Sequence, residues 1–140
     1  MSPYLDASVV VSLFIQDAMT ERAQAGLRAH SGVVTVSDWT LAEAASALAR
    51  AVRTQVLASE AALQAIDTID AWVDQAANRV EILPSDIRET EAILRSLQTA
   101  LRAPDALHIV VARRMDLALL SFDRKMIESA RDLGVQVIDA

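Results

Sequence analysis

The chain has 140 residues, of which 53% are hydrophobic and 23% charged, and its 19 acidic and 13 basic side chains give a formal charge of −6. This length fits one domain, expected to span residues 1–140, and the absence of cysteine excludes disulfides, zinc–thiolate sites and thiol nucleophiles. Three glycines are too few for a glycine-rich phosphate loop. The acidic balance lacks the basic footprint usual in nucleic-acid binders, but a bound metal ion can reverse the sign of a local acidic site.

The apolar run from Val9 to Ile15 is too short to cross a membrane, which takes about 20 apolar residues. Asp6 and Asp17 flank this run, and the basic region of a signal peptide is missing. We therefore expect a cytoplasmic protein without a membrane partner, and the lack of cysteine is compatible with that location.

Short apolar runs alternate along the chain with longer segments of helical period. In the first half, the pattern predicts a strand at 4–5, helices at 8–15 and 21–30, a strand at 33–36, and helices at 39–53 and 59–74. Ser37 or Asp38 and Ser59 are the expected N-caps of the last two helices, and Gly32 is expected near the C′ position of the helix at 21–30.

In the second half, a strand at 80–83 is followed by a helix that Ser85 caps and that reaches Leu97. A helix then begins at Pro104 and reaches Met115. A strand at 118–121, a helix at 124–133 stopped by Gly134, and a strand at 135–138 complete the chain. Apolar strands that alternate with helices indicate a parallel sheet covered on both faces, hence a small three-layer α/β domain. Ligands of such sheets bind outside the carboxyl ends of the strands.

Acidic side chains follow two of the predicted strands. Asp6 comes directly after the strand at 4–5, and Asp123 comes two residues after the strand at 118–121. An aspartate at either position could simply cap the next helix, because its carboxylate accepts backbone N–H bonds. Two such aspartates in one parallel sheet favour a shared site, since both carboxylates would project into the same crevice.

A third carboxylate lies at the start of the helix that begins at Pro104. Asp105 complements the helix dipole there, but the face it shares with His108, Ile109 and Ala112 is too apolar to be fully solvated. Asp105 is therefore expected at the margin of a cleft. His108 could ligate a metal, although a lone histidine on an apolar face is more often a hydrogen-bonded packing residue.

Glu43 lies within the helix at 39–53, opposite the apolar stripe that includes Leu41 and Leu48. A helix face opposite the core is normally charged and solvated, and this favours a solvated Glu43. The small neighbours Thr40 and Ala47 would nevertheless let another element approach, so the spacing alone does not decide the point.

Four carboxylates that converge in one pocket repel one another, at a cost on the order of 1–4 kcal/mol for each close pair. A fold tolerates such a cluster when a cation is bound or when some of the acids stay protonated. Hard oxygen ligands without a histidine pair or a thiolate favour magnesium or manganese. Such a site activates a water and orients a phosphodiester, so the implied chemistry is metal-assisted phosphodiester hydrolysis.

At these residues the chain resembles the PIN-domain nucleases, and among them the toxin ribonucleases of the VapC type. The resemblance covers nearly the whole chain and rests on the order and separation of four motifs. These are the strand ending in Asp6 with Ser8 two residues later, a helical Glu43, the Pro-Asp-Ala-Leu-His segment 104–108, and Ser121-Phe122-Asp123. The segment 104–108 is fairly specific, whereas an aspartate and a serine after a strand are weak evidence alone.

The resemblance implies a three-layer α/β/α domain with a central sheet of five parallel strands. It implies that a magnesium ion is held by Asp6, Glu43, Asp105 and Asp123, which overturns the solvated interpretation of Glu43. Ser8 and Ser121 would support these ligands through their hydroxyls, with His108 expected beside them; the family often has threonine where Ser121 stands. The implied partners are transfer or ribosomal RNA as substrate, a cognate antitoxin whose C-terminal segment blocks the acidic groove, and a second copy of the chain.

An acidic chain that acts on RNA needs basic side chains near its site. Candidates lie in the segments around Asp105 and Asp123, and arginine matches phosphate geometry in a bidentate way. They are Arg102, Arg113, Arg114, Arg124 and Lys125. Each of them could equally be an ordinary surface charge. The aromatic residues Trp39, Trp72 and Phe14 are expected in core or dimer packing rather than in base stacking.

Two other functions stay open from the sequence. One is a catalytically silent PIN-fold module that only binds or dimerises; the presence of all four acids argues against it without demonstrating turnover. The other is a receiver-like phosphoacceptor domain, which needs an acidic pair after the first strand and a lysine after the last one. Here one aspartate follows the first strand and the only lysine is Lys125, which disfavours that alternative.

Overall fold

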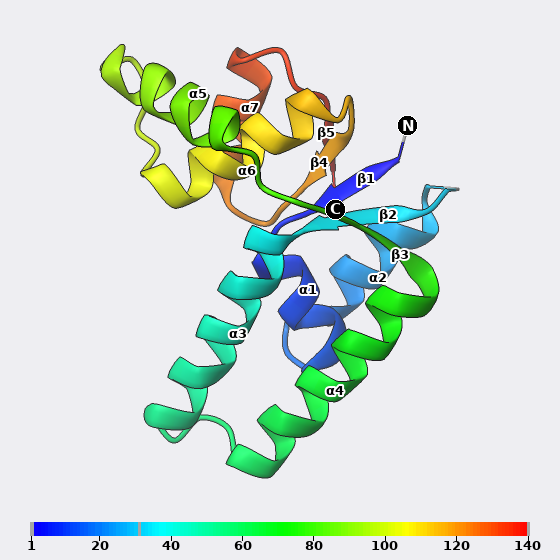
Figure 1. Ribbon diagram of the computed structural model, residues 1–140. Coiled ribbons are helices and arrows are strands. Elements are labelled where there is room, and N and C mark those ends of the chain that lie inside the picture. The colour runs from blue at the N-terminus through cyan, green and yellow to red at the C-terminus, as the bar shows by residue number, and fades with distance from the viewer. Residues whose placement is uncertain (1, 31, 140) are drawn as a thin grey trace.

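Five parallel strands form one sheet in the computed structural model, which describes residues 2–30 and 32–139 (Figure 1). Their spatial order is β3-β2-β1-β4-β5. The strands are β1 (Pro3–Leu5), β2 (Val34–Ser37), β3 (Ala77–Val80), β4 (Ala118–Leu120) and β5 (Val137–Ile138). Helices lie between all consecutive strands, as crossovers between parallel neighbours require.

Seven helices in the described part of the chain cover both faces of this sheet (Figure 1). They are α1 (Ala7–Phe14), α2 (Thr20–Arg28), α3 (Asp38–Arg53), α4 (Ser59–Ala76), α5 (Pro84–Arg95), α6 (Ala103–Arg114) and α7 (Arg124–Asp132). Helices α1–α4 lie on one face, and α5–α7 lie on the other. The predicted three-layer α/β/α fold with five parallel strands is thereby confirmed. Among the described residues, no helix has both the length and the apolar character that crossing a bilayer demands.

The two faces of the sheet bury alternate residues of the same strands, as the pleat dictates. Leu5 and Leu120 point into the core that α1–α4 cover. Their neighbours Tyr4 and Leu119 point into the second core, which includes residues of α6 and α7. Because both faces are covered, the central strands consist of unbroken apolar runs rather than alternating polar and apolar residues.

The carboxyl ends of the three middle strands lie side by side. Leu5 of β1 is opposite Leu120 of β4, and Tyr4 of β1 is opposite Thr35 of β2. Helices α1 and α3 begin directly after β1 and β2 at this edge. The residue that follows β1 is therefore brought next to the residues that follow β4, although they are far apart in sequence.

The third strand lies three residues earlier than predicted. Helix α4 continues to Ala76, and the chain then pairs at once with β2 over residues 77–80. The predicted strand at 80–83 is wrong beyond its first residue, because the apolar residues after it pack elsewhere instead of pairing with β2. Ile82 packs on the core beneath α6, and Leu83 occupies the N-cap position of α5. As an edge strand, β3 depends on backbone pairing and needs no apolar run.

One of the predicted N-caps in the first half is correct and one is wrong. The Ser37 hydroxyl accepts a hydrogen bond from the Thr40 N–H at 3.0 Å and so caps α3. Ser59 is instead the first residue of α4, and Ala58 occupies the cap position without a side-chain bond. The helix begins at Ser59 as predicted, so the residue before it, rather than Ser59 itself, occupies the cap position.

The predicted cap of α5, Ser85, is also wrong. Helix α5 begins at Pro84, whose fixed φ suits the first helical position. The role of a cap passes to Asp86, whose carboxylate reaches back to the N–H of Leu83 at 2.8 Å. The same carboxylate binds Arg114 of α6, so it joins two helices and has a reason to be buried.

Gly134 stops α7 as predicted, with a φ of 79° that an L side chain adopts at a cost. The N–H groups of Gly134 and Val135 bind the carbonyls of Arg131 and Ala130 at 3.1 and 2.8 Å, which satisfies the helix end. Because Val135 belongs to this turn, the last strand begins later than predicted, at Val137.

Gly32 does not stop its helix. Helix α2 ends at Arg28 with Ala29 as C-cap, so Gly32 lies beyond the C′ position. Its φ of 131° shows that it serves the turn into β2 instead.

Candidate active site

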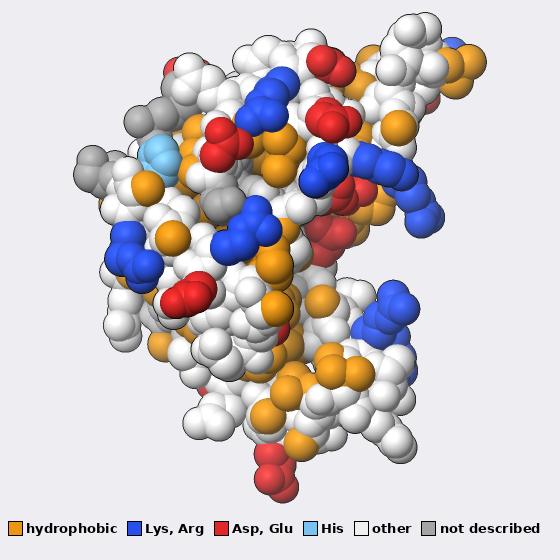
Figure 2. Space-filling view, turned by 180° about the vertical axis from the view of Figure 1, so that it is seen from behind, with side chains coloured by type: hydrophobic (Ala, Val, Ile, Leu, Met, Phe, Trp, Pro, Cys, Tyr) orange, Lys and Arg blue, Asp and Glu red, His pale blue; other side chains and the backbone are white. Residues whose placement is uncertain are grey.

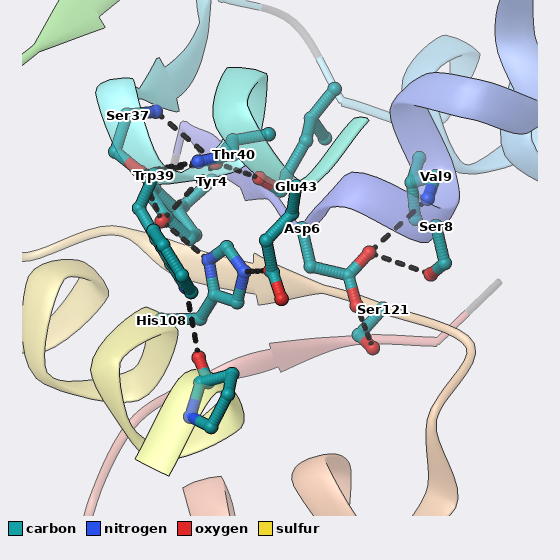
Figure 3. A network of polar contacts seen from close by, with 12 residues as sticks. Tyr4, Asp6, Ser8, Val9, Ser37, Trp39, Thr40, Glu43, His108 and Ser121 are labelled. Atoms are coloured by element: carbon teal, nitrogen blue, oxygen red, sulfur yellow. Dashed lines mark hydrogen bonds and ion pairs between the residues drawn. The ribbon is translucent and has the colours of Figure 1, made fainter. Parts of the chain in front are cut away.

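Asp6 is fixed at the carboxyl end of β1 by three donors. Its Oδ1 accepts bonds from the Ser8 hydroxyl at 2.7 Å and the Val9 N–H at 3.1 Å, and its Oδ2 accepts from the Ser121 hydroxyl at 2.6 Å (Figure 3). The bond from Val9 makes Asp6 the N-cap of α1, so the capping interpretation of this residue is correct. The residue is 4% exposed, and its carboxylate still lines a pocket.

Ser121 links Asp6 to Asp123. While its hydroxyl donates to Asp6, the same oxygen accepts the N–H of Asp123 at 3.0 Å. Asp123 in turn caps α7 by accepting the Met126 N–H at 3.2 Å. Both strand-following aspartates thus cap helices and line one pocket, so the two interpretations of them do not compete.

Asp105 lies in the first turn of α6, which begins at Ala103 rather than at Pro104. Burial raises the pKa of Asp105 above its ordinary value, and the charges of Asp123, Glu43 and Asp6 raise it further. The charges of these three neighbours therefore oppose the ionisation of Asp105.

Glu43 reaches the same pocket from α3. Its Oε1 lies 2.5 Å from Nε2 of His108, and its side chain is 27% exposed. The interpretation of Glu43 as a freely solvated charge is therefore wrong. That interpretation failed because α6 lies against the face of α3 opposite the core stripe, and its His108 contacts Glu43 there.

A buried polar network supports His108 from behind (Figure 3). Its Nδ1 lies 2.7 Å from the Tyr4 hydroxyl, which lies 2.8 Å from the Ser37 hydroxyl. Burial raises the pKa of Tyr4 far above its ordinary value, and the charges of Asp6 and Glu43 act in the same direction, so the phenol keeps its proton. The sequence predicts Tyr4 only as a strand residue, because nothing in it places this phenol beside a histidine 104 positions later.

Together these side chains line a pocket of about 430 Å³ at the carboxyl edge of the sheet. All four predicted acids lie in its wall, with Ser8 and His108 beside them. Figure 2 shows acidic side chains in the hollow of the molecule, with Lys and Arg side chains at its edges. Two polar lining residues, Ser12 and Asp17, were not predicted as site residues from the sequence, and they bind each other at 3.0 Å. Asp17 also accepts the N–H of Met19, which gives it a structural task in the loop before α2.

The pocket fits a hard divalent cation, because carboxylate oxygens line it and no thiolate is present. The three bonds that Asp6 accepts leave part of the capacity of its carboxylate, about four lone-pair sites, for another partner. Within residues 2–30 and 32–139, no three acidic or histidine side chains already stand at the spacing that encloses a metal ion. Mg²⁺ commonly keeps several waters and binds through one or two carboxylates, which suits such an open arrangement.

The five predicted RNA-contacting cations fall into two groups. Arg113 and Arg114 close the C-terminal end of α6, away from Asp105 at its start. Arg113 pairs with Glu89, and Arg114 binds Asp86 at 2.8 Å. These two side chains thus join α6 to α5. The others are exposed at the starts of α6 and α7, where Asp105 and Asp123 also lie: Arg102, Arg124 and Lys125.

The aromatic residues pack as predicted. Phe14 and Trp72 meet with ring centroids 5.3 Å apart on the α1–α4 side of the sheet. Trp39 packs against the other core and donates its indole N–H to the Pro104 carbonyl at 3.1 Å, which ties α3 to the start of α6.

A larger groove of about 860 Å³ lies between α3, α5 and α6, and its wall is mostly apolar. Trp39 of α3 and Leu107 of α6 line it, together with Ile87 and Leu94 of α5 and Leu97 just beyond α5. Only the smaller pocket gathers the four acids, and so we take the smaller pocket as the candidate active site.

Comparison with known proteins adds two findings. A family model described as PIN domain matches residues 4–132. A search of curated proteins gave no significant match.

Solved structures with a similar fold include proteins of toxin–antitoxin systems. VapC20 of Mycobacterium tuberculosis, a toxin that cleaves the sarcin–ricin loop, is 19% identical with a TM-score of 0.72, over 91% of this chain and 95% of that chain. VapBC2 of Rickettsia felis, bound to a promoter DNA fragment, is 14% identical with a TM-score of 0.69, over 98% and 97%. FitAcB of Neisseria gonorrhoeae is 16% identical with a TM-score of 0.66, over 97% and 96%. At these identities the likeness establishes the fold alone.

Proposed function

The chain belongs to the PIN-domain family, and from this premise we propose that it is a magnesium-dependent endoribonuclease, the toxin component of a type II toxin–antitoxin module. One observation carries the proposal: carboxylates from four separate segments line one pocket at the carboxyl edge of the sheet. Structural neighbours described as toxins and toxin–antitoxin complexes support it.

In this proposal Asp6, Glu43, Asp105 and Asp123 hold a magnesium ion, for which manganese can substitute. The bound ion supplies charge neutralisation at the phosphodiester and an activated water. Burial and the charges of the other three acids raise the pKa of Asp105, and a bound cation would offset that repulsion.

The chain's own residues orient these ligands. Ser8 and Ser121 hold the two oxygens of Asp6 in fixed directions, and the shared Ser121 oxygen keeps Asp123 beside it. Arg102, Arg124 and Lys125 are free to contact the phosphates of an RNA, because they are exposed at the helix starts that carry the acids. We propose no such contact for Arg113 and Arg114, since both pair with acids of α5.

The proposed partners are three. The substrate is an RNA of the transfer or ribosomal class. A cognate antitoxin covers the acidic pocket with its C-terminal segment. A second copy of the chain packs on the apolar groove, whose residues Ile87 and Leu97 are 53% and 86% exposed and would gain from burial.

The function is tested by incubating the purified protein with total RNA and Mg²⁺, with and without a chelator. We expect cleavage that the chelator abolishes. Loss of a contact that only supports a metal ligand typically costs 10- to 100-fold in activity. The variant Asp6→Asn alters a proposed ligand itself, so its cleavage rate should fall by roughly 100-fold or more. Its fold should survive, because asparagine also caps helices well.

Asp70→Asn is the matched control, since it removes one exposed carboxylate on α4 and should cleave like the unmodified protein. Cleavage that persists in both the chelator and Asp6→Asn would refute the metal mechanism. If the folded, partner-free protein cleaves no RNA, the catalytically silent module becomes the better description. Co-expression with the neighbouring reading frame should yield a stable complex, and failure to bind would count against the toxin assignment.

A further inference from the structure

We propose that His108 is a positioning residue for Glu43, and that Tyr4, oriented by Ser37, fixes the tautomer in which His108 acts. The inference rests on the proposed function in one respect, namely that Glu43 is a metal ligand. It concerns how this chain keeps a long, flexible side chain in the acidic pocket.

The four acids are held very unequally. Asp6 accepts three hydrogen bonds, and Asp123 is fixed by the N–H of Met126. Glu43 has one hydrogen-bond partner within the described residues, and this partner is Nε2 of His108 at 2.5 Å. Glutamate has a large rotamer entropy, and Ala47 on the next turn of α3 is too small to confine it. The direction of the Glu43 carboxylate therefore depends on the imidazole.

The protons of the network can be assigned by counting donors and acceptors. An ionised carboxylate only accepts, so the bond to Glu43 requires a proton on Nε2 of His108. In neutral imidazole Nδ1 is then an acceptor, and the group 2.7 Å away is the Tyr4 hydroxyl, which must donate.

The remaining hydroxyls agree with this direction. Thr40 donates to the Leu5 carbonyl at 3.0 Å and, over a longer 3.3 Å, to the Tyr4 oxygen, and it accepts the Ser37 N–H at 3.2 Å. Ser37 accepts the Thr40 N–H, and its own proton has two acceptors within reach, the Tyr4 oxygen at 2.8 Å and the Thr40 hydroxyl at 3.1 Å. The shorter contact favours donation to Tyr4. One chain of donors therefore runs from Ser37 through Tyr4 and His108 to Glu43, and hydrogen bonds in such chains strengthen one another.

The imidazole is a rigid support. His108 is fully buried in the middle of α6, and its ring lies 5.6 Å from the ring of Tyr4 (Figure 3). Because Tyr4 belongs to β1, the network fixes Glu43 of α3 relative to the strand that ends in Asp6. Outer partners of this kind commonly orient metal ligands, and their loss typically costs 10- to 100-fold in metal affinity.

The test uses two amide side chains at position 108, each of which can keep one of the two hydrogen bonds that the imidazole makes. In His108→Gln the amide N–H₂ lies at the distance of Nε2 from the backbone and can still donate to Glu43. In His108→Asn the amide lies at the distance of Nδ1, so it can meet Tyr4 but falls short of Glu43. Ile109→Val, a mild change at the adjacent buried position of α6, controls for a general loss of packing.

The first readout is the ¹⁵N spectrum of the imidazole rings in the metal-free protein. The chain has two histidines, His30 and His108, and the His108 variants assign the signals. We expect one neutral tautomer with the proton on Nε2. Tyr4→Phe should lower the population of that tautomer, because it removes the donor to Nδ1. A proton on Nδ1 of the unmodified protein, or no change in Tyr4→Phe, would overturn the inference.

The second readout is the affinity for Mn²⁺ alone, measured by electron paramagnetic resonance of the free ion. His108→Asn should bind Mn²⁺ about 10- to 100-fold more weakly. His108→Gln and Ile109→Val should stay within a few-fold of the unmodified protein. Equal affinities in all variants, or equal losses in both amides, would overturn positioning through Nε2. If His108→Asn fails to fold, Tyr4→Phe takes its place, with a smaller loss of affinity expected.

The two proposals fail in different ways. If Mn²⁺ affinity follows the expected order but no RNA is cleaved, the positioning role stands and the ribonuclease function falls. If Mg²⁺-dependent cleavage is present and His108→Asn binds Mn²⁺ and cleaves normally, the function stands and the positioning role falls. A protein that binds no Mn²⁺ would overturn both.

Discussion

The carboxylate of Asp6 has two roles. It caps α1 through the Val9 N–H and faces the acidic pocket, while Ser8 and Ser121 fix its orientation. A capping aspartate stabilises its helix typically by about 1 kcal/mol, which helps to offset the repulsion from the other acids. Asp123 repeats this solution at α7. Asp105 lies in the first turn of α6 without capping it, and burial and its acidic neighbours raise its pKa.

Asp105→Asn should therefore stabilise the metal-free protein at neutral pH. The pKa of this carboxyl is higher in the folded protein than in the unfolded chain, where it is about 3.9. The carboxyl therefore stabilises the fold at pH values below about 3.9, and this stabilisation is lost as the pH rises through the pKa of the folded state. The variant should melt at a higher temperature than the unmodified protein at pH 7.5 and at the same temperature below pH 3.9. Melting curves in chelator at both pH values test this. Asp70→Asn, which alters an exposed carboxylate, is the control, and an equal gain from it or a loss at pH 7.5 in Asp105→Asn would contradict the explanation.

Helix α6 joins the acidic pocket to the other helices on its face of the sheet, α5 and α7. Its start carries Asp105, its middle carries His108, and its end carries Arg114. Arg114 binds both oxygens of Asp86, at 2.8 and 2.9 Å, and donates to the Glu81 carbonyl at 3.0 Å. Since Asp86 also fixes the first turn of α5, one buried carboxylate sets how α5 meets α6.

Removing Arg114 should destabilise the fold strongly, because Asp86 is 1% exposed and would keep an uncompensated charge. We expect Arg114→Ala to lower the free energy of unfolding by about 3 kcal/mol in urea titrations. Arg113→Ala should cost at most about 1 kcal/mol, since its pair with Glu89 is exposed. Adding Asp86→Asn to Arg114→Ala should recover part of the loss, because no charge then remains buried. Similar costs for both arginine variants would show that the buried pair contributes no more than a surface one.

At the scale of the whole molecule, the acidic pocket and the apolar groove lie on two sides of the same junction. Trp39 of α3 and Leu107 of α6 line the groove, and their neighbours on these helices, Glu43 and His108, line the pocket. The indole bond from Trp39 to the Pro104 carbonyl holds α3 and α6 together between them. A partner seated in the groove would thus pack against the helices that carry the acids.

If a second copy covers the groove, the chain of 15.1 kDa should have twice that mass in solution. Ile87→Glu would place a charge in the apolar contact and should yield a monomer, because an unpaired buried charge is costly. Leu63→Glu is the matched control, since Leu63 is 62% exposed on α4, outside the groove, and should leave the dimer intact. Light scattering coupled to size exclusion measures the masses. A monomeric unmodified protein, or a dimeric Ile87→Glu, would contradict this arrangement.

Much of the fold was predictable from local pattern. The runs at 4–5 and 118–121 predict strands, because burial on both faces of a sheet demands nearly continuous hydrophobicity. The structure ends the second of these strands one residue earlier, at Leu120. Ser37 and Gly134 marked helix ends because capping and a positive φ act on the neighbouring backbone alone. The edge strand β3 was misplaced because pairing with β2, rather than composition, positions it.

The sequence by itself determined which acids follow which strands, because strand, turn and helix start are consecutive in the chain. Only the tertiary structure decided the surroundings of Glu43. By helical period that side chain belongs to the solvated face of α3, and it becomes part of the pocket because α6 brings His108 against it. The Tyr4–His108 contact, like the Ser121–Asp6 bond, joins positions more than a hundred residues apart. Such contacts follow from sheet order and helix packing, which no local window of sequence contains.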